Sequence, residues 1–234
     1  SDSGEGEDDF VFALSKEEIA RFHSQGYLGP FAAVTPEEMA EIRARIEREV
    51  LTSDGPNKKN RLQCRHLDHR FIYDLCSRPQ IIDRMRSLYG DDLILWASYF
   101  FNKEPGGCEI PWHQDLNYWP LEPVVNISAW MAIDEVTVEN SCVRLIPGSH
   151  KYVVPHIKSP DGMAFSEMAD MTGIDQSNLV HMELKPGEFF LFNEKTLHQS
   201  EPNRSKKRRM GMAMRVTVPF VKIEHDVPPL FPGH

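Results

Sequence analysis

The stretch PWHQD at residues 111–115 is the most informative part of this sequence for its fold, and TLH at residues 196–198 complements it. His113 and Asp115 lie two positions apart, so on an extended strand both side chains project to the same side and can reach one ion. With His198 they supply two imidazoles and one carboxylate, which can occupy one face of an octahedral metal ion and leave the opposite face open. This set is typical of non-heme Fe(II) oxygenases. The three residues are therefore predicted to bind a metal.

The length and composition are those of a globular protein. A chain of 234 residues with 41% hydrophobic and 26% charged residues can bury a substantial core. The net charge of -9 is concentrated at the start, because residues 1–9 contain five acidic residues and no basic one. We expect a solvated, disordered acidic tail at 1–9 and a single domain over 10–234. The remaining charge gives no indication of nucleic-acid binding.

The cysteines indicate a reducing compartment. They show neither a CxxC spacing nor a dense framework, which favours free thiols. No apolar stretch approaches the roughly 20 residues needed to cross a bilayer, and nothing resembles a secretory signal. A cytoplasmic protein without membrane attachment is expected. The four cysteines are Cys64, Cys76, Cys108 and Cys142.

Three helices are predicted in the first part of the chain. Ser15 begins a capping box, and Thr35 precedes a proline at the first helical position. The third helix is predicted over residues 79–89, with Ser77 as its cap and Gly90 as its end.

The second part of the chain is predicted to be rich in β-strands. Several short strands with turn signals and no alternating helices favour an antiparallel sandwich or barrel. A long insert at residues 152–179 has weak periodicity and is typical of a lid or binding loop. The predicted strands cover 93–101, 124–133, 142–146, 188–192 and 210–220.

A basic residue beyond His198 suggests a cosubstrate. Metal oxygenases of this type commonly use a keto acid as the electron source, and an arginine can bind its far carboxylate with two parallel hydrogen bonds. Arg209 stands at the start of an apolar stretch, where a strand would point alternate residues inward. Arg208 or Arg215 would take its place if the predicted register were wrong.

A series of motifs occurs along the chain: residues 112–115, Tyr118-Trp119, 129–134, 146–150, and His198 with Ser200, Asn203 and Arg209. In this order the motifs resemble the phytanoyl-CoA dioxygenase family of Fe(II)- and 2-oxoglutarate-dependent oxygenases. The resemblance covers residues 15–221 and implies a mostly β fold with N-terminal helices and a double-stranded β-helix (jelly-roll, cupin-like) core. The segment at residues 26–31 is similar to natural-product-tailoring members related to the nonheme iron halogenases.

The resemblance implies roles for individual residues. Iron would be bound by the three predicted ligands, and Arg209 with Ser200 would hold the distal carboxylate of 2-oxoglutarate. Asn102 and Trp130 would approach the cosubstrate from neighbouring strands. In halogenases of the family a small residue replaces the carboxylate ligand and leaves room for chloride. Asp115 fills that position here, which favours hydroxylation with dioxygen over chlorination.

The substrate is less well defined. The family suggests a small metabolite or biosynthetic intermediate, free or tethered to a carrier protein. Candidate contacts are Arg65 and Asp68 in the basic loop 58–70, the aromatic pair Tyr118 and Trp119, and the insert. Desaturation and cyclisation remain alternatives to hydroxylation. A non-catalytic cupin-like binding protein and a Zn hydrolase, which can also use two histidines and a carboxylate, are the other classes considered. The oligomeric state is not indicated.

Overall fold

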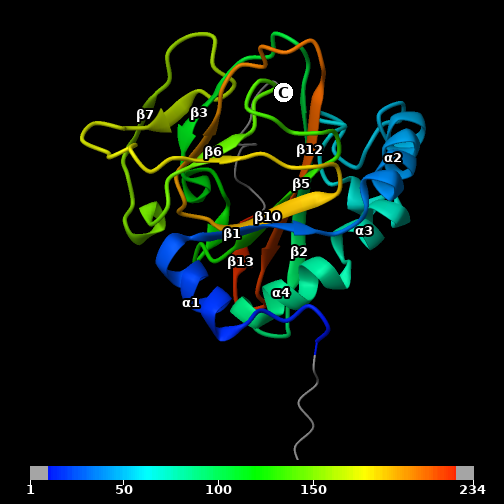
Figure 1. Ribbon diagram of the computed structural model, residues 1–234, viewed down its shortest axis with the longest axis horizontal. Coiled ribbons are helices and arrows are strands. Elements are labelled where there is room, and N and C mark those ends of the chain that lie inside the picture. The colour runs from blue at the N-terminus through cyan, green and yellow to red at the C-terminus, as the bar shows by residue number, and fades with distance from the viewer. Residues whose placement is uncertain (1–9, 225–234) are drawn as a thin grey trace, which may run out of the picture.

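Two antiparallel sheets form the jelly-roll core of the computed structural model, which describes residues 10–224 (Figure 1). The larger sheet has the strand order β1 (Tyr27–Ala32), β10 (Glu188–Asn193), β5 (Ile127–Ala132), β12 (Arg209–Thr217) and β2 (Ile94–Lys103). The smaller sheet has the order β3 (Ile110–His113), β11 (His198–Ser200), β6 (Val143–Leu145) and β9 (Val180–Met182). This is the double-stranded β-helix that the motifs implied.

The larger sheet is buried on both faces. On β12, Met210, Met212 and Met214 belong to a core cluster that the helices also enter, whereas Ala213 belongs to a second cluster with residues of the smaller sheet. Because successive side chains of a strand point to opposite faces, this alternation shows which β12 residues line the interior between the sheets. The interior face of β12 therefore begins with Arg209 and includes Arg215 near the other end of the strand.

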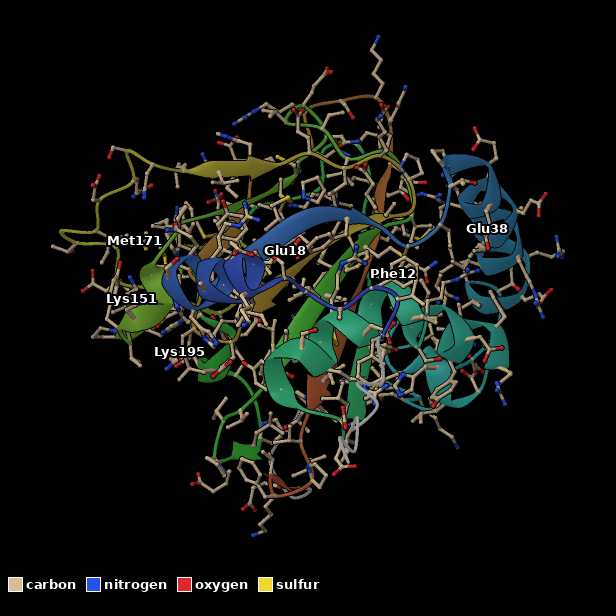
Figure 2. All side chains as sticks on the ribbon, turned by 60° about the horizontal axis from the view of Figure 1, so that its bottom comes forward. Phe12, Glu18, Glu38, Lys151, Met171 and Lys195 are labelled. Carbon is tan, nitrogen blue, oxygen red and sulfur yellow. The ribbon has the colours of Figure 1, made fainter. Side chains whose placement is uncertain are left out.

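Four α-helices pack against the outer face of the larger sheet (Figure 1). The capping box at Ser15 is confirmed, and Thr35 caps the second helix by accepting from the amide of Glu38. Glu38 and the capping-box partner Glu18 are labelled in Figure 2. The helices are α1 (Lys16–Gln25), α2 (Pro36–Arg45), α3 (Arg70–Cys76) and α4 (Pro79–Tyr89), and a π-helical turn (Ile46–Val50) follows α2.

The predicted cap at Ser77 is wrong. The Ser77 hydroxyl donates to the carbonyl of Tyr73 in the preceding helix α3, which the sequence pattern did not reveal. Arg78 stands at the N-cap position of α4 and makes no side-chain cap bond, while Gly90 ends this helix as predicted. Ser77 thus belongs to the end of one helix rather than the start of the next.

The long insert forms a hairpin beside the smaller sheet. Its strands β7 (His156–Lys158) and β8 (Glu167–Ala169) pair with each other, and β8 lies against β3. Ala169 packs with Trp112 and Leu197 in an apolar cluster, which anchors the hairpin next to the two predicted histidine ligands. A further pair, β4 (Leu121–Glu122) and β13 (Lys222–Ile223), lies outside the two main sheets.

Two expectations concern the chain as a whole. The acidic tail at residues 1–9 lies outside the described residues, and the single domain over 10–234 stays a prediction. Within residues 10–224, no helix is both long enough and apolar enough to cross a membrane.

Candidate metal centre and cosubstrate pocket

The two histidines are cross-strand neighbours. His113 ends β3 and stands opposite His198 at the start of β11, so that antiparallel pairing places one imidazole beside the other. Their ring centroids lie 4.1 Å apart, and both side chains are buried. The pairing of the two strands thereby brings His198 next to the His-x-Asp segment.

Asp115 joins the histidines across a short turn. Gln114 keeps an extended backbone, so His113 and Asp115 project to the same side before a 3-10 turn (Asp115–Asn117) begins. The Gln114 amide points elsewhere, where it donates to the carbonyls of Tyr152 and Lys195. The Asp115 Oδ1 atom lies 3.3 Å from Nε2 of His113. These contacts hold the turn that presents the carboxylate.

The three side chains could hold one metal ion. Each offers one ligand atom, and these atoms lie within 4.8 Å of one another. Nδ1 of His113 lies 2.7 Å from the Pro111 carbonyl, and Nδ1 of His198 lies 2.9 Å from the Thr196 carbonyl. Because a carbonyl only accepts, Nδ1 carries the proton in both rings and Nε2 presents its lone pair.

The surroundings of His198 and Asp115 hold both side chains in the protonation states that bind a metal cation. Burial, and then the neighbouring His113, lower the pKa of His198 to about 3, so this imidazole is neutral at pH 7. Burial alone would raise the pKa of Asp115, but the charge of Arg215 and the nearby histidines lower it well below its usual range. A neutral imidazole and an ionised carboxylate are the forms that bind a metal.

Arg215 holds the second oxygen of the carboxylate. Its Nη1 atom donates to Asp115 Oδ2 at 3.0 Å and to Ser128 Oγ at 2.8 Å, and the guanidinium is buried. Asp115 thus turns Oδ1 toward the imidazoles and Oδ2 toward Arg215. Sequence reasoning considered Arg215 only as an alternative cosubstrate residue and missed this positioning contact, because the register of β12 was unknown.

Arg209 lies at the other end of the β12 interior face. It is 1% exposed, its guanidinium lies 5.2 Å from the Trp130 ring, and Nη1 donates to the Ser141 carbonyl at 2.7 Å. Its Nε atom is buried and has no hydrogen-bond partner. By contrast, Arg208 faces outward and pairs with Asp134. Of the three arginines considered, Arg209 is the one with a fully buried donor atom that has no hydrogen-bond partner.

Ser200 is connected to Arg209 through Lys103 and Ser141, whereas Asn102 lies on the opposite face of the sheet. The Ser200 hydroxyl accepts from Nζ of Lys103 at 2.9 Å, and both residues are buried. Asn102 is exposed and stands opposite Met210 on the helix side of the larger sheet, so its predicted approach to the cosubstrate is corrected. Sequence reasoning missed Lys103 because the predicted strand ended at Phe101. Continuing the alternation by two residues would have placed Lys103 inside.

Aromatic residues lie beside the metal ligands. The Phe165 ring, from the loop of the β7–β8 hairpin, lies 4.9 Å from the His113 ring, and the Tyr118 ring lies 5.8 Å from it. The Tyr118 hydroxyl donates to the carbonyl of Glu167. Trp119 lies 5.0 Å from the Arg215 guanidinium, behind the carboxylate ligand. The structure therefore brings Tyr118 to the candidate centre and places Trp119 against Arg215.

Arg65 and Asp68 are structural in this fold. The Arg65 guanidinium is fully buried, donates to the carbonyls of Val50 and Arg61, and pairs with Asp68 at 3.0 Å. The hydrogen-bond donors of Arg65 hold the loop after α2. Arg65 and Asp68 are therefore not the substrate contact that was predicted. A buried arginine can satisfy a loop's carbonyls as readily as a ligand.

The family described as Phytanoyl-CoA dioxygenase (PhyH) matches residues 22–211. This chain belongs to the phytanoyl-CoA dioxygenase family. Dioxygenase lolE1 of Epichloe uncinata is 30% identical over 71% of this chain and 61% of its own length. A probable phytanoyl-CoA dioxygenase of Caenorhabditis elegans is 28% identical over 62% of this chain and 50% of its own length. The chain thus spans roughly half to three-fifths of these relatives.

Solved structures share the fold of this family member. CytC3 with Fe(II) and alpha-ketoglutarate is 31% identical and superposes with a TM-score of 0.73, covering 95% of this chain and 81% of CytC3. The apo form of the non-heme monooxygenase ThoJ is 25% identical with a TM-score of 0.75, covering 88% of this chain and 78% of ThoJ. These likenesses confirm the family and the jelly-roll core expected from the motifs.

The cofactors of the family fit the described residues. Phytanoyl-CoA dioxygenases use Fe(II), 2-oxoglutarate and dioxygen, as predicted here. Two imidazole Nε2 atoms and one carboxylate oxygen meet the donor preference of Fe(II). The unpartnered Nε of Arg209 suits a carboxylate such as the distal one of 2-oxoglutarate.

Proposed function

We propose that this chain is an Fe(II)- and 2-oxoglutarate-dependent dioxygenase that hydroxylates a C–H bond of a small molecule. The observation that carries the proposal is the convergence of His113, Asp115 and His198, whose ligand atoms lie within 4.8 Å of one another. These three side chains would hold Fe(II). When bound, the metal would supply oxidative decarboxylation of 2-oxoglutarate with dioxygen and removal of a substrate hydrogen.

The chain's own residues would orient the cosubstrate. Arg209 and Ser200 would bind the distal carboxylate of 2-oxoglutarate, and Trp130 would form a wall of the pocket by packing against Arg209. An apolar cluster of both sheets also lines this interior, and the Phe192 ring lies 4.9 Å from the ring of His198. Such a lining excludes water and strengthens charge interactions with the cosubstrate.

Hydroxylation is proposed over halogenation because Asp115 fills the carboxylate position. Arg215 holds Oδ2 of Asp115 at 3.0 Å, which favours a carboxylate that stays in place instead of leaving room for a halide. Desaturation and cyclisation begin with the same hydrogen removal and would be recognised from the product. A cupin-like binding protein would have no use for a buried arginine with an unpaired donor beside such a ligand set.

The substrate is proposed to contact the aromatic side of the centre. The rings of Phe165 and Tyr118 lie 5.5 Å apart and both border His113, so a partly apolar small molecule would fit them. Whether the molecule is free or carrier-tethered is an outcome of the substrate screen below. The four cysteines are free, consistent with the proposed cytoplasmic location.

Anaerobic addition of Fe(II) and 2-oxoglutarate tests the proposal. We expect a weak visible charge-transfer band, and succinate on exposure to air with a substrate from a metabolite screen followed by mass spectrometry. A product heavier by one oxygen would identify hydroxylation. Absence of both the band and succinate would reject the oxygenase assignment, and hydrolysis supported by Zn(II) alone would point to the hydrolase class.

A further inference from the structure

Two buried cations share the proposed cosubstrate pocket. Lys103 on β2 is the cross-strand partner of Arg209 on β12, and the two side chains are 6% and 1% exposed. Both contact Ser141: Nζ of Lys103 donates to its hydroxyl at 2.9 Å, and Arg209 donates to its carbonyl at 2.7 Å. Lys103 also donates to the hydroxyl of Ser200 at 2.9 Å. The two positive groups thus meet at the residues assigned to the distal carboxylate.

Neither cation has a carboxylate partner among residues 10–224. Glu201 offers Lys103 only its backbone carbonyl, at 2.8 Å, while its side chain lies 3.7 Å from Arg144 and 3.6 Å from Arg204. The Glu109 carboxylate accepts from Gln199 instead. Buried charges in proteins are normally paired, because an isolated one has lost its hydration without compensation. The pocket therefore has an excess of positive charge that an anion would neutralise.

We propose that Lys103 is a second cationic residue for the distal carboxylate of 2-oxoglutarate, acting with Arg209 and Ser200, and that it takes up a proton when this carboxylate binds. The assignment rests on the proposed function. Ser141 links Lys103 to Arg209, and Ser200 lies on the ammonium of Lys103. A carboxylate that displaces one of the ammonium's neutral acceptors would therefore gain an ion pair without movement of the backbone.

The charges around Lys103 give this binding a pH dependence. Burial, and then the charge of Arg209, lower the pKa of Lys103 to about 7. Cys108 and Glu109, from the loop before β3, act weakly in the opposite direction. The bound carboxylate favours the charged ammonium and raises the pKa of Lys103, so binding takes up protons near neutral pH. The affinity for 2-oxoglutarate should accordingly fall as the pH rises above 7.

Calorimetry of the Mn(II)-loaded full chain tests the proposal. 2-Oxoglutarate is titrated at pH 7.5 in two buffers of different ionisation enthalpy, and an uptake of a few tenths of a proton is expected. In Lys103→Met the uptake should vanish and the Kd should rise by about 10- to 100-fold, the loss of one charge-assisted contact. Lys103→Arg should keep most of the affinity and lose the uptake, because arginine stays charged. The exposed Lys206→Met is the matched control.

A second ligand separates carboxylate recognition from a structural role. 2-Oxobutyrate lacks the distal carboxylate, so its binding should cause no proton uptake and should be unaffected by Lys103→Met. If wild type binds 2-oxoglutarate without uptake, or Lys103→Met binds it as tightly, Lys103 only supports the strands and the proposal is overturned. If Lys103→Met fails to fold, Lys103→Arg decides, since unchanged uptake in it also overturns the proposal. Wild type that binds no 2-oxoglutarate overturns the proposed function itself.

Discussion

Arg215→Met is expected to weaken metal binding without disturbing the cosubstrate pocket. The change removes the 3.0 Å hydrogen bond to Asp115 Oδ2 and the 2.8 Å bond to Ser128, while methionine preserves much of the buried volume. The carboxylate then loses both its orientation and the cation that offsets its burial. Loss of such a supporting contact typically costs about 10- to 100-fold in metal affinity, which corresponds to about 1.4–2.7 kcal/mol.

The assay is anaerobic competition for Fe(II) against a chromophoric chelator, with circular dichroism to verify folding. Arg209→Met is the matched control, because it is the same substitution on the interior face of the same strand. This variant should leave the affinity for Fe(II) unchanged and should weaken the binding of 2-oxoglutarate instead. A folded Arg215→Met protein with wild-type Fe(II) affinity would refute the reasoning, since the turn at Gln114 alone would then suffice to position Asp115.

Four further changes test other parts of the structure. Asp115→Ala should abolish succinate formation in the mass-spectrometric assay, and full activity would contradict the assigned ligand set. Phe165→Ala should raise the KM for the organic substrate severalfold while the Kd for 2-oxoglutarate stays constant, because its ring borders His113 rather than the arginine pocket. Arg65→Met should lower the free energy of unfolding by about 2–4 kcal/mol in urea titrations, since buried carbonyls lose their donor; a selective change in substrate KM would instead revive its predicted binding role. Gly211→Ala should weaken the binding of 2-oxoglutarate, because a Cβ at this position collides with the Trp130 ring. Unchanged binding would show that Trp130 does not shape the pocket.

Local patterns predicted much of the candidate site. The spacing of His113 and Asp115 implies side chains on one side of an extended segment, and Gln114 does keep that backbone. The helix start signals at Ser15 and Thr35 were correct for the same reason, because a cap depends on residues within one turn. The family motifs added the fold and the cofactors, which no single spacing could supply.

The wrong expectations involved residues whose roles depend on distant contacts. Asn102 was expected beside the cosubstrate, but the next residue, Lys103, holds the interior position. The end of a strand is poorly marked in a sequence. Arg65 and Asp68 were expected to contact the substrate from the basic loop, but Arg65 is buried against carbonyls that come from Val50 and Arg61. Nothing in the charges of the loop indicated that these carbonyls would converge there.

The sequence by itself determined which residues could serve as ligands and which alternate along a strand, because side-chain periodicity is a local property. Only the tertiary structure decided which end of β12 lies beside the histidines. The register between strands placed Arg215 against Asp115, and placed Arg209 opposite Lys103. Register depends on hydrogen bonds and packing between segments far apart in the chain, so alternation along one strand cannot specify it.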